Sequence, residues 1–353
     1  MKVALVVHHA RPTGGQDRYA LELARHLSAR CEVTLVTIRA EGDLPDAVRV
    51  LPVRVPGRPL LLTAPLFRRR AASLLARRGF DIVHAIGGAL PGAGVITAQY
   101  CHAAWREVAG PRGPYHRLVT RQAVADERDA FRHPALRAVI AVSRRTAAEV
   151  EHHYGPLRAP VSVIPNAVDH GAFHPEARAR EAAASAVVLF VGAYERKGLE
   201  TAIEALALMR TPARLRAVGA GPHARFERLA ERLGVADRVA LEPPRADIAA
   251  VFRAADAFVF PTRYDPFGIV IAEALASGVP VVTSAAAGAA DLIAPGEHGY
   301  VIPDPHDAGA FAAALDATLA DRARMSAAAP AAVRELSWAA VAERTYAVYE
   351  AVS

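Results

Sequence analysis

Residues 252–282 read FRAADAFVFPTRYDPFGIVIAEALASGVPVV, and this stretch indicates the fold. An apolar run at 257–260 predicts a buried strand, and a second run at 279–283 predicts another. Between them, apolar residues recur at helical spacing, so we expect a helix that begins near Phe267 and stops at Gly278. A helix that joins two buried strands is the repeating unit of a parallel sheet with helices on its faces.

Two acidic residues, Asp265 and Glu273, stand on either side of Phe267-Gly268. In a purely structural interpretation, Asp265 caps the helix, Pro266 fits its first turn, and Glu273 faces water. In a functional interpretation, the helix N-terminus holds a phosphate or a sugar hydroxyl. Glu273 would then accept hydrogen bonds from a ribose diol, and Asp265 would accept them from a second sugar. The two carboxylates would bracket a nucleotide sugar.

The same alternation of strands and helices runs through the rest of the chain. Further strands are expected at 3–7, 33–37, 81–84, 95–98, 138–142, 187–191, 214–218 and near Val239. Further helices are expected at 18–30, 66–78, 144–154, 199–209, 224–234, after Asp307 and at 338–352. This pattern predicts an α/β fold with two Rossmann-like domains that face each other across a cleft. In such sheets the ligand site lies beyond the carboxyl ends of the strands.

The length of 353 residues suggests two domains. We predict an N-terminal domain at 1–165, a linker at 166–186, a C-terminal domain at 187–337, and a last helix at 338–353 that returns to the first domain. The boundary is rich in Pro, Asn and His, and the charge changes there. Residues 1–165 carry 24 basic and 13 acidic side chains, whereas the remainder carries 18 and 23.

The basic excess is greatest from Arg49 to Arg78, a span with eight arginines and no acidic residue. It is either a solvated face or a docking surface for an anionic acceptor or an anionic membrane. The apolar run at the N-terminus is too short for a secretory signal, and we expect no transmembrane helix. The two cysteines, Cys31 and Cys101, indicate a reducing compartment. We therefore expect a cytoplasmic protein, with peripheral contact at the inner membrane face if the docking interpretation holds.

Two loops have the features of anion sites. Gly14-Gly15 precede a helix expected near Asp17, and Arg196-Lys197 stand immediately before the helix expected at 199–209. Two cations at a helix start favour a diphosphate. Only Lys2 and Lys197 are lysines among 42 basic residues, which suggests that a compact ammonium is needed at 197.

Two other classes of function have some support. The loop GAGPHA, from Gly219 to Ala224, loosely matches a dinucleotide fingerprint, which would suit an NAD(P)-dependent oxidoreductase. Close packing of a helix on a strand explains these glycines equally well. The pI of about 9.6 allows a nucleic-acid-binding protein, but the basic residues lack interleaved aromatics, so we expect no nucleic acid partner.

Taken together, the sequence resembles the retaining GT-B-fold glycosyltransferases of family 4, most closely the bacterial lipopolysaccharide-core glucosyltransferase subgroup. The resemblance covers nearly the whole chain. It rests on the Gly14-Gly15 loop, DIVHAIGG (81–88), IAVSRRTAAEV (140–150), VIPNAVD (163–169), FVGAYERKGLETAIEAL (190–206), AVGAGP (217–222) and residues 252–282. The acid-x7-acid motif of the family is met by Asp265 and Glu273.

The resemblance implies transfer of a sugar, most often a hexose, from a nucleoside diphosphate sugar to an acceptor hydroxyl. It gives the N-terminal domain to the acceptor and the C-terminal domain to the donor. The implied donor-binding residues are Gly14, Gly15, Arg196, Lys197, Asp265, Phe267, Gly268, Ile269, Val270 and Glu273. The implied catalytic residues are Arg196, Lys197, His102 and Asp265, and the acceptor would contact Asp17 and His102. His102 is expected in the loop QYCHAAW, whereas His84 is expected to be structural.

The resemblance implies no cofactor besides the donor substrate. The chain contains no Asp-x-Asp, in line with a site that needs no metal. Asp265 stands where the family more often has Glu, and Ala193 stands where many members have Arg, so that Arg196 would supply that charge. The acceptor stays open between lipopolysaccharide core, a glycolipid and a natural product.

Overall fold

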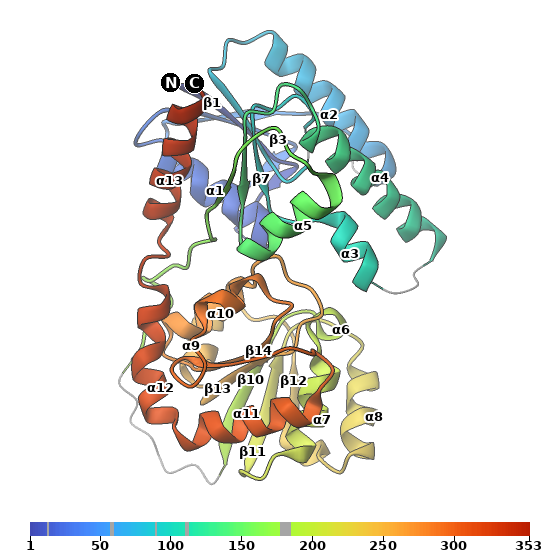
Figure 1. Ribbon diagram of the computed structural model, residues 1–353, viewed down its shortest axis with the longest axis vertical. Helices are drawn as coiled ribbons and strands as arrows, with labels where there is room; N and C mark the ends of the chain where they lie inside the picture. The colour runs from blue at the N-terminus through green and yellow to red at the C-terminus, as the bar shows by residue number, and fades with distance from the viewer. Residues whose placement is uncertain (13, 57–59, 89, 110–112, 177–184) are drawn as a thin grey trace. The chain divides into compact units, whose positions relative to one another are not determined.

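The computed structural model describes residues 1–12, 14–56, 60–88, 90–109, 113–176 and 185–353 (Figure 1). The chain divides into two compact units, called unit 1 and unit 2 below. Unit 1 comprises Met1–Asn166 together with Trp338–Ser353, and unit 2 comprises Ala167–Ser337. The alanine-rich part of the expected linker falls on residues 177–184, which lie outside the described residues.

Unit 1 contains a seven-stranded parallel sheet in the order β5-β3-β1-β6-β7-β8-β9. Its strands are β1 (Lys2–Val6), β3 (Glu32–Thr37), β5 (Val48–Pro52), β6 (Ile82–Ile86), β7 (Val95–Ala98), β8 (Ala138–Ala141) and β9 (Val161–Val163). Its helices are α1 (Gly15–Leu27), α2 (Leu60–Ala76), α3 (His102–Val108), α4 (Pro114–Phe131), α5 (Arg144–Tyr154) and α13 (Trp338–Val352). A separate two-stranded pair joins β2 (His9–Ala10) to β4 (Arg39–Ala40).

Unit 2 contains a six-stranded parallel sheet in the order β12-β11-β10-β13-β14-β15. Its strands are β10 (Ala186–Val191), β11 (Ala213–Val218), β12 (Val239–Glu242), β13 (Ala257–Phe260), β14 (Val281–Ser284) and β15 (Gly299–Ile302). Its α-helices are α6 (Tyr194–Lys197), α7 (Leu199–Leu208), α8 (His223–Arg232), α9 (Ile248–Arg253), α10 (Ile269–Ala276), α11 (Ala308–Ala320) and α12 (Arg322–Ala328). Short 3-10 turns lie at Ala236–Arg238, Gly288–Leu292 and Ala329–Val333.

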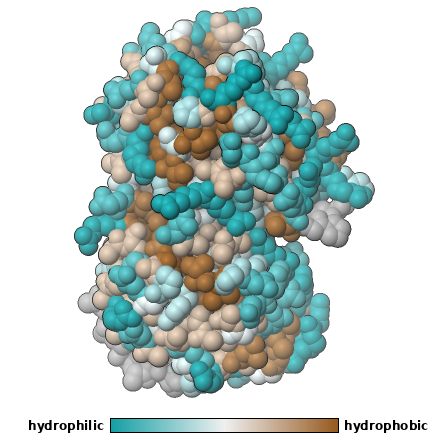
Figure 2. Space-filling view, viewed as in Figure 1, coloured by the Kyte–Doolittle hydropathy of each residue, from teal (hydrophilic) through white to brown (hydrophobic). Residues whose placement is uncertain are grey.

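The central strands are apolar because helices cover both faces of each sheet. All four residues of β13 and of β8 are buried, and neither strand alternates in polarity. In unit 2, one core joins the side chains of β10 and β11 to those of α7, α8 and α11. Figure 2 shows hydrophilic residues over much of the visible face, interrupted by separate hydrophobic patches.

The C-terminal helix α13 belongs to unit 1, although the chain reaches it only after crossing unit 2. In Figure 1 this red helix lies beside the blue helix α1, and residues of the two helices are in contact. Tyr349 of α13 is fully buried and bonds to His84 of β6, with 2.6 Å between its hydroxyl oxygen and Nδ1. The other ring nitrogen of His84 lies 2.7 Å from the hydroxyl oxygen of Thr97.

The structure confirms the predicted α/β class with parallel sheets in two domains. Several elements differ from the prediction. The strands β2, β4, β5, β9 and β15 and the helices α3, α4, α6 and α9 were not predicted. Arg196 and Lys197 therefore lie in the one-turn helix α6 rather than in the loop expected from the sequence. Helix α2 begins at Leu60 rather than residue 66, because Pro65 lies inside the helix instead of ending it. Helix α10 begins at Ile269 rather than near Phe267. None of the described helices has the length and apolar character needed to cross a membrane.

Candidate functional site

In unit 2, the structure brings together two of the predicted site residues that lie far apart in the sequence. Lys197 ends the one-turn helix α6, and its ammonium donates a short hydrogen bond to Oδ2 of Asp265. The ammonium also lies 5.3 Å from the centre of the Phe260 ring, at the end of β13. The side chains of Lys197 and Asp265 are only 8% and 15% exposed, so this is a nearly buried ion pair.

Two glycines fix the backbone that carries Lys197. Gly198 has φ 82°, and a Cβ atom there would lie 2.0 Å from the carbonyl oxygen of Pro261. Gly192 has φ 137°, and a Cβ atom there would lie 3.0 Å from the side chain of Lys197. The αL backbone and the close approach both require glycine at 198. The loop after β10 is therefore held directly against the end of β13.

The electrostatics of this pair favour a further anion. Burial lowers the pKa of Lys197, and the carboxylate of Asp265 acts in the opposite direction. Arg196 is half-buried next to it, and none of the described residues forms an ion pair with its guanidinium. Lys197, whose charge is neutralised by Asp265, thus stands next to Arg196, whose guanidinium has no ion-pair partner in the described part of the chain. An incoming diphosphate would supply the missing negative charge.

Asp265 does not cap the helix that follows it, which corrects the structural interpretation. The helix cap is Gly268, with φ 88°, and Phe267 lies before the helix. Asp265 accepts a 3.3 Å hydrogen bond from the backbone N–H of Phe267, and its own backbone pairs with residues 286–288. The amides of Ile269 and Val270, at the first two helical positions, have no intrahelical acceptor.

Glu273 lies in the second turn of α10 and is 6% exposed. The purely structural interpretation, in which Glu273 faces water, is therefore wrong. A carboxylate at a buried helix position needs polar partners, which is incompatible with a purely surface position. Its proposed contact with a ribose remains a prediction.

The glycine-rich loop from Gly219 to Ala224 has a structural explanation. A Cβ atom on Gly219 would lie 1.9 Å from the carbonyl oxygen of Gly192, and one on Gly221 would lie 2.7 Å from the Tyr194 side chain. The loop after β11 therefore packs against the loop after β10. This packing accounts for the loose dinucleotide fingerprint without a nicotinamide cofactor.

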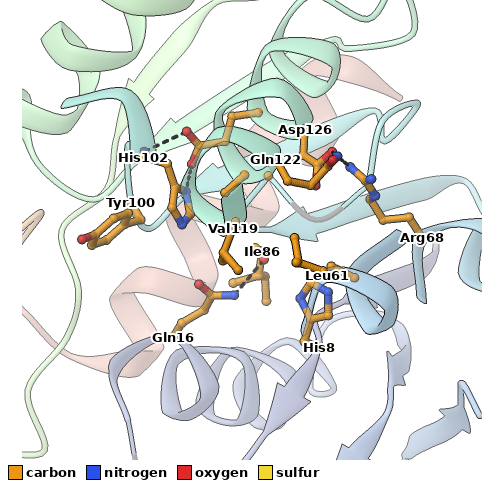
Figure 3. A pocket seen from close by; sticks show the side chains of 15 residues that line it. His8, Gln16, Leu61, Arg68, Ile86, Tyr100, His102, Val119, Gln122 and Asp126 are labelled. Atoms are coloured by element: carbon orange, nitrogen blue, oxygen red, sulfur yellow. Dashed lines mark hydrogen bonds and ion pairs between the residues drawn. The ribbon is translucent and has the colours of Figure 1, made fainter. Parts of the chain in front are cut away.

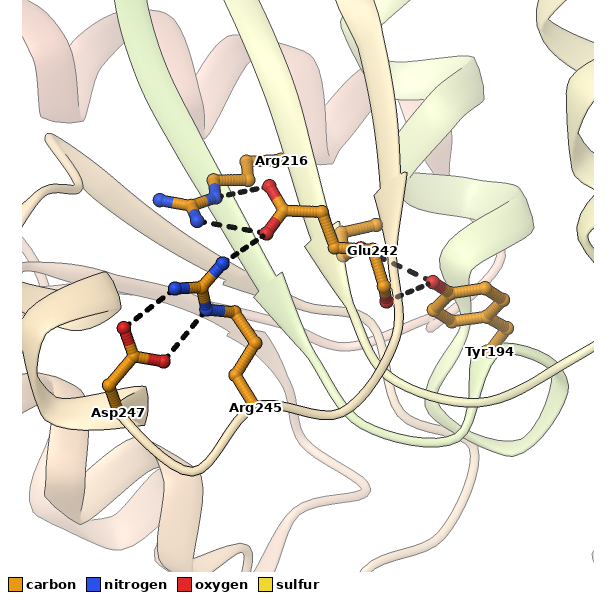
Figure 4. A network of polar contacts seen from close by, with 6 residues as sticks. Tyr194, Arg216, Glu242, Arg245 and Asp247 are labelled. Carbon is orange, nitrogen blue, oxygen red and sulfur yellow. Dashed lines mark hydrogen bonds and ion pairs between the residues drawn. The ribbon is translucent and has the colours of Figure 1, made fainter.

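A polar network lies at the carboxyl ends of β11 and β12 (Figure 4). Arg216 donates two hydrogen bonds to the carboxylate of Glu242, at 2.5 and 2.9 Å, and these hold the pKa of Glu242 below its ordinary value. Arg245 donates two more to Asp247, at 2.8 and 2.6 Å. The hydroxyl of Tyr194 donates to the backbone carbonyl of Glu242 at 2.9 Å. These contacts hold the loop after β12 in place beside α6.

In unit 1, a cavity of about 260 Å³ lies at the carboxyl ends of β1, β6 and β7. It is lined by His8, Gln16, Leu61, Ala64, Arg68, Ile86, Gly87, Gly88, Tyr100, His102, Val119, Gln122, Ala123, Asp126 and Glu127. Figure 3 shows the labelled side chains of α1, α2, α3 and α4 converging on this space. This is the edge of the sheet where a ligand is expected in an open α/β fold.

His102 lies on this cavity at the first position of α3, not in a loop as predicted. Its Nδ1 donates a 2.6 Å hydrogen bond to Glu127, and its backbone N–H donates to the same carboxylate at 2.8 Å. Glu127 is 2% exposed and also accepts a short hydrogen bond from the Tyr154 hydroxyl. Glu127 was not predicted, because it lies 25 residues after His102 within an arginine-rich helix. It fixes the ring of His102 and leaves Nε2 available to a ligand.

The other predicted residues of unit 1 lie at the start of α1. Gly15 is the first residue of this helix and Gly14, with φ 90°, is its cap, so the helix begins earlier than expected. Asp17 accepts a 2.7 Å hydrogen bond from Arg11, so its carboxylate already has a cationic partner. Gln16, which was not predicted, lies between them and lines the cavity. The donor contact expected for Gly14 and Gly15 remains a prediction.

His84 is structural, as expected. It is fully buried in β6, and its two ring nitrogens are occupied by Tyr349 and Thr97. Burial lowers its pKa to about 3.

Two family models match this chain. The model described as "Glycosyltransferase Family 4" matches residues 13–171, and the model described as "Glycosyl transferases group 1" matches residues 185–321. The first match covers most of unit 1 and the second most of unit 2.

Curated relatives align over most of their length. The D-inositol 3-phosphate glycosyltransferase of Xylanimonas cellulosilytica is 30% identical over 411 positions, which cover 99% of this chain and 96% of the relative. The lipopolysaccharide glucosyltransferase WaaG of Escherichia coli K12 is 28% identical over 329 positions, which cover 86% of each protein.

Solved structures show the same architecture. The crystal structure of WaaG, described as a glycosyltransferase involved in lipopolysaccharide biosynthesis, superposes with a TM-score of 0.80 at 26% identity over 99% of both chains. The crystal structure of Anabaena Alr3699/HepE in complex with UDP-glucose superposes with a TM-score of 0.73 at 19% identity, covering 99% of this chain and 100% of the other. At 19% identity, the match to HepE supports a shared fold and nothing further.

Proposed function

This chain belongs to glycosyltransferase family 4, and from that premise we propose that it moves a sugar from a nucleoside diphosphate sugar to an acceptor hydroxyl with retention at the anomeric carbon. The observation that carries the proposal is the buried pair of Lys197 and Asp265, with Arg196 beside it and the start of α10 nearby in the sequence. Cations and helix amides suit a diphosphate, whereas a carboxylate suits sugar hydroxyls.

The difficult step in this reaction is departure of the nucleoside diphosphate. Negative charge grows on the β-phosphate as the glycosidic bond breaks. In our proposal, Arg196, Lys197 and the amides at Phe267–Val270 stabilise that charge, and no metal takes part. A single preorganised donor of this kind typically contributes about 3 kcal/mol. Asp265 then holds hydroxyls of the donor sugar, and Glu273 holds the ribose.

Retention requires that the acceptor attack from the side that the diphosphate leaves, or that a covalent intermediate form. We propose front-side attack, in which a departing phosphate oxygen takes the proton of the acceptor hydroxyl. His102 would orient the acceptor or the transferred sugar through Nε2, because Glu127 occupies Nδ1. Asp17 would have a secondary role, since Arg11 already engages its carboxylate.

For the substrates, we propose chemical classes rather than individual compounds. We propose a hexose donor, since one relative is named a glucosyltransferase. The names of the relatives point to different acceptors, namely lipopolysaccharide and D-inositol 3-phosphate, so they do not define the acceptor of this chain. We also propose peripheral contact with an anionic membrane through the arginines of 49–78, most of which are exposed in the described residues.

Replacement of Lys197 by alanine tests the donor site. We expect kcat for sugar release from the preferred nucleotide sugar to fall by about 100- to 1,000-fold, as for loss of one preorganised charge-stabilising donor. The donor is first identified by thermal shift against a panel of uridine, guanosine and adenosine diphosphates and their glucose or mannose derivatives. Turnover is then measured as release of the nucleoside diphosphate.

The matched control is Lys2→Ala, which removes the only other lysine of the chain, an exposed one on β1. Lys2→Ala should retain wild-type turnover. Full activity in Lys197→Ala, or an equal loss in both variants, would contradict the proposal. So would the absence of a thermal shift with every nucleotide of the panel.

A further inference from the structure

The cavity of unit 1 has an apolar wall that the proposed chemistry does not require. Helix α2 contributes Leu61 and Ala64, and helix α4 contributes Val119 and Ala123. Ile86, at the end of β6, continues this surface. Figure 3 shows Leu61, Ile86 and Val119 on the border of the same space. Apolar walls of this kind gain free energy when they cover an apolar part of a ligand.

The polar side of the cavity offers groups that can bind hydroxyls. Gln16 donates one hydrogen bond from its amide nitrogen to the carbonyl of Ile86, at 3.2 Å, and keeps its amide oxygen for another partner. His102 keeps Nε2, because Nδ1 is bonded to Glu127. Among the described residues, Nε2 of His8 has no hydrogen-bond partner. An amide oxygen and imidazole nitrogens are hydrogen-bonding groups of the type that recognise sugar hydroxyls.

The arginine of the described lining is already paired with a carboxylate. Arg68 forms a short ion pair with Asp126, and their side chains are 16% and 12% exposed. Gln122 donates a 2.7 Å hydrogen bond to the same carboxylate, which fixes it toward the guanidinium. Burial lowers the pKa of His8 to about 4, so this ring is neutral at pH 7. Arg68 is thus the one arginine of the described lining, and its charge is taken up by Asp126.

We propose that this cavity selects an uncharged acceptor, in which a hydroxyl-bearing ring adjoins an apolar portion, and that the Arg68–Asp126 pair excludes phosphorylated acceptors. The hydroxyls meet Gln16 and His102, and the apolar portion lies along α2 and α4. This inference rests on the proposed function and specifies the acceptor class for it.

The physical reason is the cost of desolvating an anion. A phosphate that enters the cavity loses its hydration, and it meets two carboxylates, Asp126 and Glu127, against one guanidinium that is already paired. To bind the phosphate, Arg68 would have to leave Asp126 as a buried carboxylate without its cation, which is strongly unfavourable. An uncharged acceptor avoids both penalties.

Binding of three matched probes to the full chain, without donor, tests the proposal. The probes are hexyl β-D-glucopyranoside, the same glycoside phosphorylated at O6, and methyl β-D-glucopyranoside, with affinities measured by saturation-transfer NMR. We expect the hexyl glycoside to bind most tightly, with each of the other two weaker by about tenfold or more. Equal or tighter binding of the phosphorylated probe, or failure of the hexyl glycoside to bind more tightly than the other two, would overturn the proposal.

Variants show whether the ion pair is the cause. Asp126→Asn frees the charge of Arg68, whereas Ala123→Lys adds a new cation to the lining and keeps both Arg68 and Asp126. In each variant, the ratio of the affinity for the hexyl glycoside to the affinity for its phosphorylated form should fall by about tenfold. The double variant Arg68→Gln, Asp126→Asn keeps the cavity neutral and should retain the wild-type preference. Arg69→Gln, at an exposed neighbour on α2, is the surface control.

If both Ala123→Lys and a folded Asp126→Asn kept the wild-type ratio of the two affinities, the Arg68–Asp126 pair would not be what excludes phosphorylated acceptors. Ala123→Lys keeps this test decisive if Asp126→Asn does not fold. The donor test at Lys197 uses nucleotide sugars and no acceptor. A protein that turns over a nucleotide sugar but prefers the phosphorylated probe would keep the proposed function and lose this inference.

Discussion

At the scale of single residues, Gly198 shows how the backbone sets up the donor site. Its φ of 82° and the 2.0 Å approach of a hypothetical Cβ to the Pro261 carbonyl leave no room for a side chain. We expect Gly198→Ala to lower the free energy of unfolding by about 1–2 kcal/mol through αL strain, and by a further ~1–3 kcal/mol through overpacking. Affinity for the nucleoside diphosphate should fall as well, because the adjacent Lys197 is displaced from Asp265.

The chain provides a matched control for this substitution. Gly234 also has a positive φ, 69°, but a Cβ atom there would have no neighbour within 4 Å. Gly234→Ala should therefore lose only the strain term of about 1–2 kcal/mol, with unchanged nucleotide binding. Urea unfolding and calorimetric titration measure both quantities. Equal effects of the two substitutions would show that the contact with Pro261 is unimportant.

Glu127 acts on the reaction through His102, so we class it as a positioning residue. Glu127→Gln would replace the carboxylate that accepts from Nδ1 and the backbone N–H of His102. We expect kcat to fall by about tenfold or more, in the range typical for groups that assist acid–base or orienting chemistry. The KM of the donor should change little, because most of the predicted donor-binding residues, those around Lys197 and Asp265, belong to unit 2.

The control is Asp129→Asn, which removes an exposed carboxylate two positions along the same helix. It should leave both kinetic constants unchanged. If Glu127→Gln raised the donor KM and lowered stability without a separate loss of kcat, the carboxylate would have only a structural role.

At the scale of secondary-structure elements, α13 is held to the sheet of unit 1 by the buried bond between Tyr349 and His84. Burial lowers the pKa of His84 to about 3, so the folded protein keeps this ring neutral. The unfolded chain binds a proton below about pH 6.5. The unfolded state therefore takes up more protons, and this group contributes stability that is present above pH 6.5 and is lost progressively toward pH 3.

We expect the free energy of unfolding to fall between pH 7 and pH 4.5, with a smaller fall in His84→Gln. Glutamine can bond to both Tyr349 and Thr97 but does not titrate. Urea unfolding of both proteins at the two pH values gives the comparison. The same pH dependence in the two proteins would mean that His84 does not contribute to acid sensitivity.

Elements with a strong local pattern were predictable, whereas those governed by tertiary context were not. The buried strands β8 and β13 are short apolar runs, and the sequence predicts both. The edge strand β5 was missed because three of its five residues are exposed. Helix α2 was truncated in the prediction, since local propensity alone disfavours Pro65 inside a helix.

The same distinction applies to the candidate site. Arg196, Lys197, Asp265 and Glu273 could be named from the sequence because they form local patterns after predicted strands. The first two are a cation pair before a helix, and the other two are acidic residues on either side of Phe267-Gly268. Their roles remain predictions. The ion pair between Lys197 and Asp265 could not be predicted, because it joins residues 68 positions apart. It depends on how closely the loop after β10 packs against β13, which no local pattern specifies.

At the scale of the whole molecule, the N-terminal and C-terminal halves of the chain differ in net charge. The first 165 residues carry a clear basic excess, and the rest of the chain is acidic overall. On unit 1, Arg49, Arg54 and the α2 residues Arg69, Arg70, Arg77 and Arg78 are exposed. Arg68 is turned toward Asp126 and does not join them. The exposed side chain of Leu62 lies on the same helix. Basic and apolar groups on one helix are typical of peripheral membrane contact.

We expect the protein to pellet with vesicles that contain anionic lipid at low salt and to remain in solution with neutral vesicles. Each arginine near an anionic surface contributes about 1 kcal/mol to binding, so Arg69→Gln, Arg77→Gln and Arg78→Gln together should abolish pelleting.

The control neutralises three exposed arginines of unit 2, Arg214, Arg228 and Arg232, and should pellet like the wild type. Because the attraction is screened beyond a Debye length of about 10 Å at 0.1 M salt, raising the salt should release the wild-type protein. Equal recovery of the protein with both lipid compositions would show that the arginine-rich span is an ordinary solvated face. An equal loss of pelleting in both triple variants would show that the net charge of the protein, rather than helix α2, governs the contact.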